Sequence, residues 1–453
     1  MWPIDVVAFW NGAQMRDLLE AIVFIVGGAD FAGLARSVVL VGLLAAVIGG
    51  IVRWRHESMY MFVVVFVVSA MVLLVPRTPV TVRDVRAGTA YVVNDVPVGA
   101  AFLVTLSSRL GYWLGNAFES AFIPVSDEAA RFTRFGMAFP QRAVEAIRSV
   151  GAVTPTGRGF LNALMSECVV LEMIENPARA QEVFASANLE MTITQAGWLN
   201  PARYVVGPDG LSRSCPIMAI DTFNYLRANE VPQLQRLLGA QLVGMEPNPT
   251  AAVSGAIASA ETALLNLSRS FADAAMQSML RAGVGDGLQQ SSHPDAVALA
   301  SAFAAAQANV SSVINYRTMS KIAETLLPTL RNAVEFVALA AFPIVIVLVM
   351  GAGIGGAVLL RGYVMIFAWL ALWPPLYAVV NYLMVRVDGS PMSRLLTEYG
   401  GDTMVAAKLI QHMGATSQDM AGMLAILVPV IAFALVRGGD IAASSLVSGI
   451  LGP

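Results

Sequence analysis

The sequence predicts an all-α polytopic membrane protein with about five transmembrane helices and a mainly helical periplasmic domain that carries a short β-hairpin. Three observations lead to this fold class. Of the 453 residues, 57% are hydrophobic and only 13% are charged, whereas soluble domains are roughly 25% charged. Several apolar stretches approach the roughly 20 residues that a helix needs to cross a bilayer. Residues 76–332 separate these stretches into two groups and are numerous enough to form a domain.

The N-terminal segment, residues 1–33, is expected to contain an amphipathic or re-entrant helix. Residues 4–27 are apolar, but four charged residues interrupt them: Asp5, Arg16, Asp17 and Glu20. This interruption favours a helix that lies at the membrane surface over a full crossing. Such a helix either anchors the chain to lipid or contacts neighbouring subunits, and both interpretations stay open.

Residues 34–75 are predicted to form the first two transmembrane helices, over 34–52 and 58–75. The short link between them, RWRHE, contains Arg53 and Arg55. Short loops rich in arginine and lysine stay on the cytoplasmic side of a membrane, so this link is predicted to be cytoplasmic. The N-terminus and the segment after Pro76 then lie in the periplasm.

Residues 76–332 are predicted to be a periplasmic domain that begins with a β-hairpin. Alternating valines from Val80, a glycine turn and the stretch TAYVVNDV are typical of two paired strands. Residues 98–123 are apolar but interrupted by charged side chains, which favours a helix packed on the membrane part or its surface over a further crossing. Alanine-rich residues 249–282 and 295–326 are predicted to form a helical hairpin around the loop GVGDGLQQSSHPD.

Residues 333–437 are predicted to hold three further transmembrane helices, over 333–350, 363–385 and 419–436. Alternation across the membrane places Arg361, between the first two of these, and Arg437, after the last, in the cytoplasm. Both positions agree with the positive-inside rule. Residues 386–418 become a periplasmic loop, and residues 438–453 become a cytoplasmic C-terminal tail.

Charged residues inside membrane spans usually mark ion pathways. The candidates here are Arg36 and Glu335. Both lie near the end of a predicted span, so we expect their side chains to extend to the interface rather than to form a buried site.

The two cysteines, Cys168 and Cys215, both fall in the predicted periplasmic domain. The periplasm permits disulfide bonds, and a bond here would close a loop of about 48 residues with a stabilisation on the order of 4 kcal/mol. The alternative is two separately buried free thiols. We expect the disulfide because the predicted topology places both cysteines outside the cytoplasm.

The stretch WLALWPPLYAVVNYLM, residues 369–384, combines a membrane-like composition with residues that disturb an apolar helix. Five of its side chains are predicted to form a helix kink and an interhelical packing face: Trp373, Pro374, Pro375, Tyr377 and Asn381. Inside a helix, the two prolines would leave the carbonyls of Leu370 and Ala371 without amide partners. Membranes tolerate such breaks only where protein or water satisfies the freed groups. The face therefore packs on protein, either within one subunit or between subunits.

No constellation of catalytic residues is recognisable. The sequence contains no phosphate-binding loop with its lysine, no HExxH, no GxSxG and no CxxC. With a net charge of −3 it offers no basic surface for nucleic acid. We therefore expect a protein that is not an enzyme, needs no cofactor and acts on no small-molecule substrate.

Three stretches, taken in order, resemble the N-terminal region of the TraG family of conjugation proteins. They are VVNDVPVGAAFLVTLSSRLGYWLGNAFESAF at 92–122, LALWPPLYAVVNYLM at 370–384 and RGGDIAASSLVSGILG at 437–452. Each is weak alone, but their order and spacing cover most of the chain from about residue 30. The resemblance implies a subunit of a conjugative type IV secretion system, similar to the polytopic inner-membrane subunit of simpler secretion machines.

The resemblance also implies partners and a location. It implies a multi-pass protein of the bacterial inner membrane that forms a homo-oligomer, with a pentamer expected. Its partners would be membrane lipids, stalk or pilus components of the same machine and, in passing, a transferred DNA–protein substrate. Longer family members carry a further C-terminal region for mating-pair stabilisation. The resemblance therefore implies the channel role, whereas mating-pair stabilisation and entry exclusion stay open for this chain.

Two other functions are weighed against this one. In a membrane-anchored periplasmic adhesion or mating-pair module, residues 76–332 would carry the activity and the transmembrane helices would only anchor them. About five transmembrane helices are more than an anchor needs. A secondary transporter would need polar residues that converge at the centre of the bilayer, and the spans offer only Asn381 with scattered serines and threonines. A stable ring in mild detergent would favour the channel subunit over both.

Overall fold

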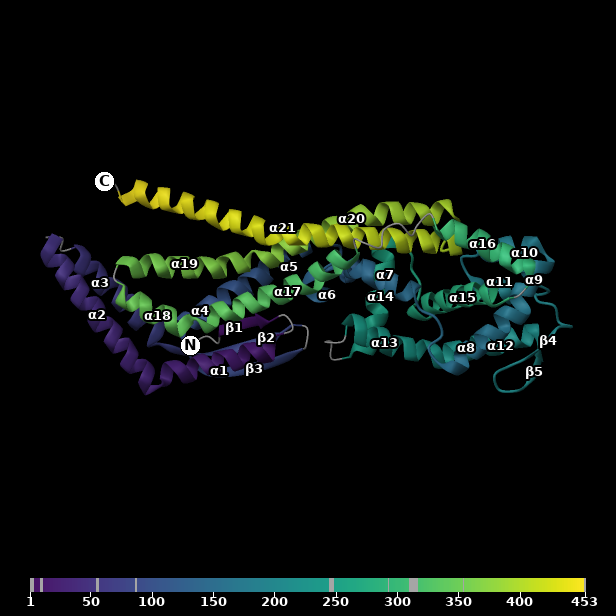
Figure 1. Ribbon diagram of the computed structural model, residues 1–453, viewed down its shortest axis with the longest axis horizontal. Coiled ribbons are helices and arrows are strands. Elements are labelled where there is room, and N and C mark those ends of the chain that lie inside the picture. The colour runs from purple at the N-terminus through teal and green to yellow at the C-terminus, as the bar shows by residue number, and fades with distance from the viewer. Residues whose placement is uncertain are drawn as a thin grey trace. The chain divides into compact units, whose positions relative to one another are not determined.

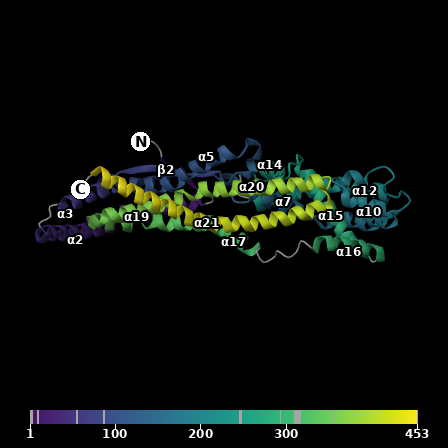
Figure 2. The same ribbon diagram turned by 90° about the horizontal axis from the view of Figure 1, so that it is seen from above.

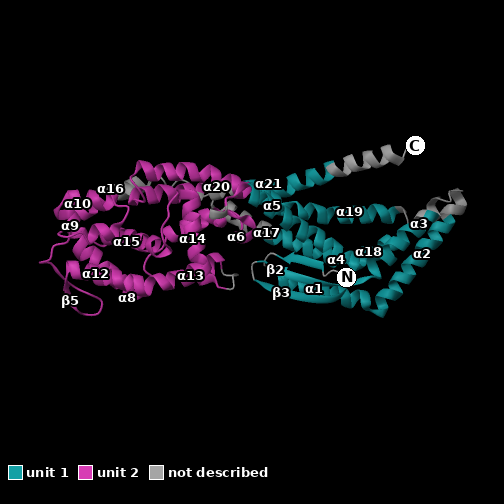
Figure 3. Ribbon diagram, turned by 180° about the vertical axis from the view of Figure 1, so that it is seen from behind, with its two compact units in different colours: residues 1–121, 323–379, 424–453 teal, residues 122–322, 380–423 magenta. Residues whose placement is uncertain are grey.

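The structure is a computed structural model that describes residues 4–8, 11–53, 57–85, 88–243, 248–291, 293–308, 317–352 and 354–451. The chain is mostly helical, with a small amount of β-structure (Figure 1). It divides into two compact units, each built from separate stretches of sequence (Figure 3). Unit 1 comprises Met1–Ala121, Ala323–Val379 and Leu424–Pro453, and unit 2 comprises Phe122–Ile322 and Val380–Met423.

Unit 1 contains a three-stranded sheet in the order β1-β2-β3, formed by β1 (Ile4–Ala8), β2 (Arg77–Asp84) and β3 (Thr89–Pro97). The predicted hairpin is confirmed, because β2 and β3 pair antiparallel with Val82 opposite Tyr91. Residues 4–8 correct the expected helix over 4–27, because they form a strand parallel to β2 with Val6 opposite Val82. β-branched residues favour a pleated, half-buried strand, and the long connection that a parallel partner requires is present in residues 11–76.

Helix α1 (Gly12–Gly27) forms the rest of the predicted N-terminal helix and packs on this sheet. Its buried apolar side chains recur at helical spacing: Met15, Leu18, Leu19, Ile22 and Val26. At its start, the amide of Gly12 donates a hydrogen bond of 2.9 Å to the buried carboxylate of Asp84. A carboxylate at a helix N-terminus satisfies a free amide and complements the helix dipole, so Asp84 ties α1 to β2.

The apolar helices of unit 1 occupy the predicted membrane spans. They are α2 (Ala29–Arg53), α3 (Glu57–Val67) with its π-helical continuation η1 (Val68–Leu74), α18 (Phe342–Gly351), α19 (Ile354–Ala371), and parts of α20 (Trp373–Glu398) and α21 (Met404–Leu451). Helix α17 (Arg317–Ala340) precedes α18.

By length and composition, the described residues hold two helices able to cross a membrane, Ala29–Ile48 and Gly355–Glu398. A third exists if Thr329–Ala340 and Phe342–Gly351, bent by 45° at their junction, form one span. Two further apolar helices, Phe62–Leu74 and Gly422–Gly438, are shorter. At 1.5 Å per residue the first of these reaches only about 20 Å, less than the roughly 30 Å hydrocarbon layer. The expected number of about five spans is therefore not confirmed.

Residues 98–122 form a nearly continuous helix made of α4 (Val98–Thr105), π-helical η2 (Leu106–Leu110) and α5 (Gly111–Phe122). Four side chains of α4 (Ala100, Ala101, Leu103 and Val104) are buried in the apolar core of unit 1, together with Leu339, Phe342 and Phe367 from α17, α18 and α19. This segment therefore packs against the apolar helices, which is one of the two placements expected from its sequence.

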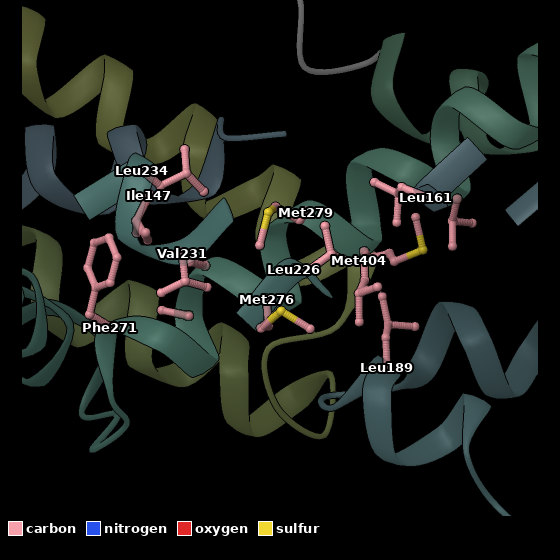
Figure 4. Packing of buried hydrophobic residues seen from close by; sticks show 14 of the residues in the cluster. Ile147, Leu161, Leu189, Leu226, Val231, Leu234, Phe271, Met276, Met279 and Met404 are labelled. Atoms are coloured by element: carbon pink, nitrogen blue, oxygen red, sulfur yellow. The ribbon is translucent and has the colours of Figure 1, made fainter. Parts of the chain in front are cut away.

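Unit 2 is a helical domain whose core surrounds α15 (Phe271–Gln290). The remaining elements are η3 (Val125–Ala130), α6 (Phe132–Phe135), α7 (Phe139–Arg148), α8 (Pro155–Leu164), η4 (Met165–Val169), α9 (Val170–Glu175), α10 (Pro177–Ala185), α11 (Leu189–Ile193), β4 (Tyr204–Val206), β5 (Ser212–Ser214), α12 (Cys215–Tyr225), η5 (Leu226–Glu230), α13 (Val231–Val243), α14 (Pro249–Leu265) and α16 (Pro294–Ala308). Met276 and Met279 of α15 lie among leucine, isoleucine and valine side chains of several other helices (Figure 4). Flexible methionines suit such an irregular junction.

The helical hairpin expected around GVGDGLQQSSHPD has its turn at the end of that stretch, because α15 ends at Gln290, α16 begins at Pro294 and the two helices are in contact. The first expected arm, 249–282, is broken between α14 and α15, where Asn266 adopts a left-handed conformation with φ of 54° and Ser270 caps α15. The glycines at 283–287 lie inside α15. A Cβ at Gly283 would lie 2.7 Å from the side chain of Leu161, so this glycine permits close helix packing rather than a turn. The second expected arm, 295–326, is only partly within the described residues.

Residues 386–418 form a helical hairpin, not an open loop. Helices α20 and α21 run side by side here (Figures 1 and 2) and are joined by a short turn at residues 399–403. Apolar side chains of the hairpin belong to the core of unit 2: Val385, Met392, Leu396, Met404, Ala406 and Ile410. Because residues 122–308 and this hairpin share one hydrophobic core, both must lie on the same side of any membrane.

Candidate functional site: a helical hairpin clamped in unit 2

The two prolines of the WPP motif lie in the first turn after a one-residue break at Leu372, within the long apolar helix Gly355–Glu398. Helix α19 ends at Ala371 and α20 begins at Trp373, so Pro374 and Pro375 occupy its first turn. An amide at the start of a helix has no intrahelical acceptor, so proline is tolerated there at little cost. The carbonyl of Ala371 meets Gly111 of α5, where a Cβ would lie only 2.8 Å from the carbonyl oxygen. This glycine lets α5 approach the break closely.

The aromatic side chains of the motif are buried inside the chain itself. Trp373 and Tyr377 are 1% and 2% exposed, and their rings meet edge to face with centroids 6.2 Å apart. Trp373 makes a similar contact with Trp369, whose Nε1 donates a 2.8 Å hydrogen bond to the carbonyl of Pro429 in α21. These three aromatic side chains therefore pack on one another and on α21 within the chain.

Asn381 is fully buried and fastens α20 to the backbone of unit 2. Its Oδ1 accepts a hydrogen bond of 2.8 Å from the amide of Ala138, and its Nδ2 donates one of 2.5 Å to the carbonyl of Ala130. Ala138 is left-handed with φ of 50° and is the N-cap residue that precedes α7. The expected interhelical hydrogen bond is therefore a bond from a helix to the connecting segment 130–138.

Asp388 extends this attachment two helical turns further along α20. It is 4% exposed, and its Oδ2 accepts a hydrogen bond of 2.7 Å from Nε2 of Gln141 in α7. We call Asn381, Asp388 and their partners Ala130, Ala138 and Gln141 the α20 seam. Buried polar groups that are hydrogen-bonded in this way fix the register of a helix more narrowly than apolar contacts do.

Replacing Asn381 with leucine tests the α20 seam. The substitution keeps a similar volume but leaves the amide of Ala138 and the carbonyl of Ala130 buried without this partner. We expect a loss of about 1–3 kcal/mol in the free energy of unfolding. Thermal unfolding of the purified protein in detergent measures it. Asn229→Leu is the control, because that exposed side chain bonds only to the carbonyl of Tyr225 in its own helix. If both substitutions lowered the free energy of unfolding equally, the α20 seam would contribute no more than a hydrogen bond at the surface.

The turn of the hairpin is held by a group of buried charges around Asp402. Three guanidiniums reach its carboxylate: Arg148 at 2.8 Å, Arg269 at 2.7 Å and Arg281 at 2.6 Å. Arg281 also donates to the backbone carbonyl of Asp402 at 3.0 Å. Arg269 in addition pairs with Glu261 through two hydrogen bonds, of 2.7 and 2.5 Å. We call these five residues the tip cluster.

The tip cluster contains more positive than negative charge. Burial alone would raise the pKa of Asp402, but Arg148, Arg281 and Arg269 outweigh it and hold that pKa well below its ordinary value. Burial, together with the neighbouring Arg148 and Arg269, lowers the pKa of Arg281 to about 10 against the pull of Asp402. Buried ion pairs of this kind add little net stability, yet removing one partner is strongly destabilising. The cluster thus positions the turn of the hairpin.

A second buried ion pair lies among the apolar helices of unit 1. Arg331 and Glu335 are 5% and 2% exposed, and Nη1 of Arg331 lies 3.3 Å from Oε2 of Glu335. Ser107 of η2 completes the group, because its hydroxyl bonds to Glu335 and its carbonyl accepts from Arg331. The expectation that Glu335 extends to the interface is therefore wrong. Arg36, by contrast, is exposed as expected.

Cys168 and Cys215 are joined in a disulfide with their Cα atoms 5.7 Å apart. Both are fully buried, and the bond links η4 to the first residue of α12. The described residues contain no free cysteine. The bond thus closes the segment that includes α9 to α11 and the β4–β5 hairpin.

Replacing both cysteines with serine should lower the free energy of unfolding by about 2–4 kcal/mol, because the unfolded chain regains the freedom of the open loop. Thermal unfolding with and without reductant measures the effect. The wild type should lose stability on reduction, whereas the double variant should not respond. Alkylation of both thiols in the unreduced wild-type protein would contradict the bond.

The structure describes three of the four arginines from which the membrane topology is predicted. Arg361 of α19 and Arg437 of α21 are exposed. Arg53 ends α2, and Arg55 lies outside the described residues. Across the described ranges, no three histidine, cysteine, aspartate or glutamate side chains come together to hold a metal ion.

Sequence reasoning found Asn381 but not the residues that meet it, nor the tip cluster. Asp402 follows two glycines, and its partners are spread from position 148 to position 281. Only the two glycines signalled a turn there.

Comparison with known proteins places the chain in a family. Residues 9–452 match the family described as TraG-like protein, N-terminal region. Protein TraG of Escherichia coli strain K12 is 20% identical over 456 residues, which cover 98% of this chain and 46% of that protein. The chain therefore spans about half the length of the curated relative it matches. No solved structure matches it.

Proposed function

We propose that this chain, which belongs to the TraG-like family, is an inner-membrane scaffold and channel subunit of a conjugative type IV secretion system. The observation that carries the proposal is the extent of the family match. It covers the apolar helices of unit 1 and the disulfide-bonded core of unit 2 alike, so both units lie within the region that matches this family. In this role the chain supports DNA transfer and the assembly of pili or mating pairs.

Two features support a periplasmic location for unit 2. The Cys168–Cys215 disulfide suits an oxidising compartment, because cytoplasmic thiols are kept reduced. The shared core of unit 2 also requires residues 122–308 and the hairpin to lie on one side of the membrane. The positive-inside rule gives the same side for both when Arg53 and Arg55 are cytoplasmic.

Fusions of alkaline phosphatase test this topology, because the enzyme is active only where its own disulfides form. A fusion after Gln290, at the exposed end of α15, should be active. A fusion after Val52, at the predicted cytoplasmic end of α2, should be silent. The reverse pattern would invert the topology and place unit 2 in the cytoplasm.

The proposed subunit acts as a homo-oligomer, and a pentamer is expected from the resemblance to simpler secretion machines. Its other partners are membrane lipids and the stalk or pilus components of the machine, with a DNA–protein substrate in transit. Native mass spectrometry in mild detergent tests the assembly: a single closed oligomer supports the scaffold role, and a monomer alone contradicts it.

Deletion of the gene from a donor strain tests the function itself. Transfer to recipients should fall to background and return when the full chain is supplied in trans. The Asp402→Ala variant should restore less transfer than wild type, since the hairpin of unit 2 would be released. Unchanged transfer in the deletion strain would exclude the proposed role.

A further inference from the structure

A cleft of about 260 Å³ lies in unit 2 beside α20. Its walls are the last turn of α14, the segment that leads into η3, and one face of α20 (Figure 3 shows α14 and α20 within the magenta unit). The α20 residues that line it recur at helical spacing: Tyr382, Val385, Arg386, Gly389, Ser390 and Ser393. Gly389 lets α20 approach the last turn of α14 closely, since a Cβ there would lie 3.2 Å from the carbonyl oxygen of Ala263.

If the protein lies in a membrane as proposed, the depth of the cleft follows from the position of its residues along α20. Arg386 is the first charged residue after the apolar stretch 363–385. From Arg386 to Ser393 the helix rises by roughly 10 Å. The headgroup layer on each side of a bilayer is roughly 5–8 Å thick. The cleft therefore lies at the level of the lipid headgroups.

Aromatic side chains at the same level support this depth. Phe122 and Tyr382 both line the cleft, and their rings stack with centroids 5.0 Å apart. The guanidinium carbon of Arg386 lies 5.7 Å from the centre of the Tyr382 ring. Tyrosine and arginine at the end of an apolar helix are typical of the membrane interface.

The lining of the cleft carries both charges. Arg386 of α20 provides a cation, and Asp127 provides a carboxylate. The final turn of α14 also lines the cleft, and its carbonyls carry the negative end of the helix dipole. The hydroxyls of Ser390 and Ser393 belong to the same helix as Arg386. The cleft thus matches a small group that carries both an anion and a cation.

We propose that this cleft binds the headgroup of a phosphatidylethanolamine-type phospholipid. Arg386 and the serine hydroxyls hold the phosphate, and the ammonium lies at Asp127 and the carbonyl end of α14. The volume is below the roughly 300–1,000 Å³ of pockets that enclose drug-sized ligands, so it suits a headgroup whose acyl chains stay outside. A lipid with a phosphate but no ammonium, such as phosphatidylglycerol, can bind Arg386 and the serines but has no group for Asp127 and the carbonyl end of α14.

Native mass spectrometry of the full chain in detergent tests the site. Phosphatidylethanolamine and phosphatidylglycerol with identical acyl chains are added in turn, and soluble O-phosphoethanolamine serves as a competitor. The wild type should retain phosphatidylethanolamine at least fivefold better than phosphatidylglycerol. Arg386→Gln should lower that retention at least fivefold. Asp127→Asn should lower it for phosphatidylethanolamine while leaving phosphatidylglycerol unchanged.

Arg394→Gln is the matched control. Arg394 is a second exposed arginine of α20, two turns further on, and it lines a neighbouring hollow rather than this cleft. Equal retention in the Arg386 and Arg394 variants, or no preference for phosphatidylethanolamine in the wild type, would overturn the site. Competition by O-phosphoethanolamine at the same concentration as the lipid would overturn its assignment to a lipid. The proposed function fails separately, by unchanged DNA transfer in the deletion strain.

Discussion

Replacing Asp402 with alanine should destabilise unit 2 by about 5 kcal/mol, since removing one partner of a buried charge pair typically costs about 3–5 kcal/mol and here three guanidiniums lose it together. Arg148, at 1% exposure of its side chain, cannot turn to solvent. For a domain of this size the loss corresponds to a fall in melting temperature on the order of 10 °C. Near-UV circular dichroism of the purified protein in detergent follows the transition, and limited proteolysis locates it in the hairpin.

Asp209→Asn is the control for this prediction. Asp209 also pairs with an arginine, and its hydrogen bonds to Arg213 lower its pKa to about 2, but it lies at the surface. Exposed ion pairs contribute little to stability. We therefore expect almost no shift in melting temperature. A comparable shift in both variants would show that burial of the tip cluster does not matter.

A second variant, Asp402→Asn, tests how the stability supplied by Asp402 depends on pH. The expected dependence follows from the direction in which folding shifts the pKa of Asp402. A carboxylate whose pKa is lowered on folding contributes stability above its unfolded pKa of about 4 and loses it only as the pH falls through the folded value. The pKa of Asp402 is held well below its ordinary range. The stability difference between wild type and Asp402→Asn should therefore stay constant from pH 5 to pH 8. Unfolding curves across that range measure it, and a difference that shrinks near pH 6 would contradict the assignment.

Local patterns in the sequence predicted the elements whose causes are local. Alternation of Val80 and Val82 predicted the β-hairpin, and the long apolar runs predicted helices. Strand β1 was not predictable in this way, because its partner lies more than 70 residues away, at Val80 to Asp84. A five-residue apolar stretch next to a helical pattern reads as the start of that helix unless a distant strand edge is known.

The WPP motif shows the same limit within one helix. Two prolines after an apolar run are compatible with a kinked helix or with the start of a new one. The contact made at this break is with Gly111, which lies more than 250 residues earlier and lets α5 sit against the carbonyl of Ala371. Glu335 is similar, because its buried side chain bonds to Ser107, which lies more than 200 residues earlier in the sequence.

The tip cluster also depends on contacts between distant parts of the sequence, because each arginine that reaches Asp402 lies more than 100 residues before it. Its charged residues come from α7, α14, the link before α15, α15 itself and the turn between α20 and α21. Each arginine alone is typical of a solvated helix surface. The hairpin therefore joins unit 2 through contacts that sequence periodicity does not encode, and these contacts tie residues 380–423 to the disulfide-bonded domain.

Replacing Gly42 with leucine should prevent unit 1 from packing correctly. Gly42 of α2 crosses α18 at Gly351, and a Cβ at Gly42 would lie 2.1 Å from the carbonyl oxygen of Gly351. Small residues let helices in membranes approach until their backbones touch. A backbone oxygen cannot rotate away, so the cost should exceed the roughly 1–3 kcal/mol of an overpacked core. Size-exclusion chromatography in detergent should show aggregated protein, with a much lower melting temperature for any monodisperse fraction.

Gly33→Leu separates this effect from the general cost of changing glycine in α2. Gly33 lies on the same helix, and a Cβ there would meet nothing within 4 Å. We expect it to elute as wild type and to melt at the same temperature or slightly higher, because leucine favours a helix over glycine by roughly 0.5–1 kcal/mol. Gly351→Leu should repeat the Gly42 defect, since a Cβ at that position would lie 2.5 Å from the side chain of Val38. If both crossing variants behaved like Gly33→Leu, the contact between α2 and α18 would not hold unit 1 together, and the packing of α2 would have to come from its short contacts with α1 and α3.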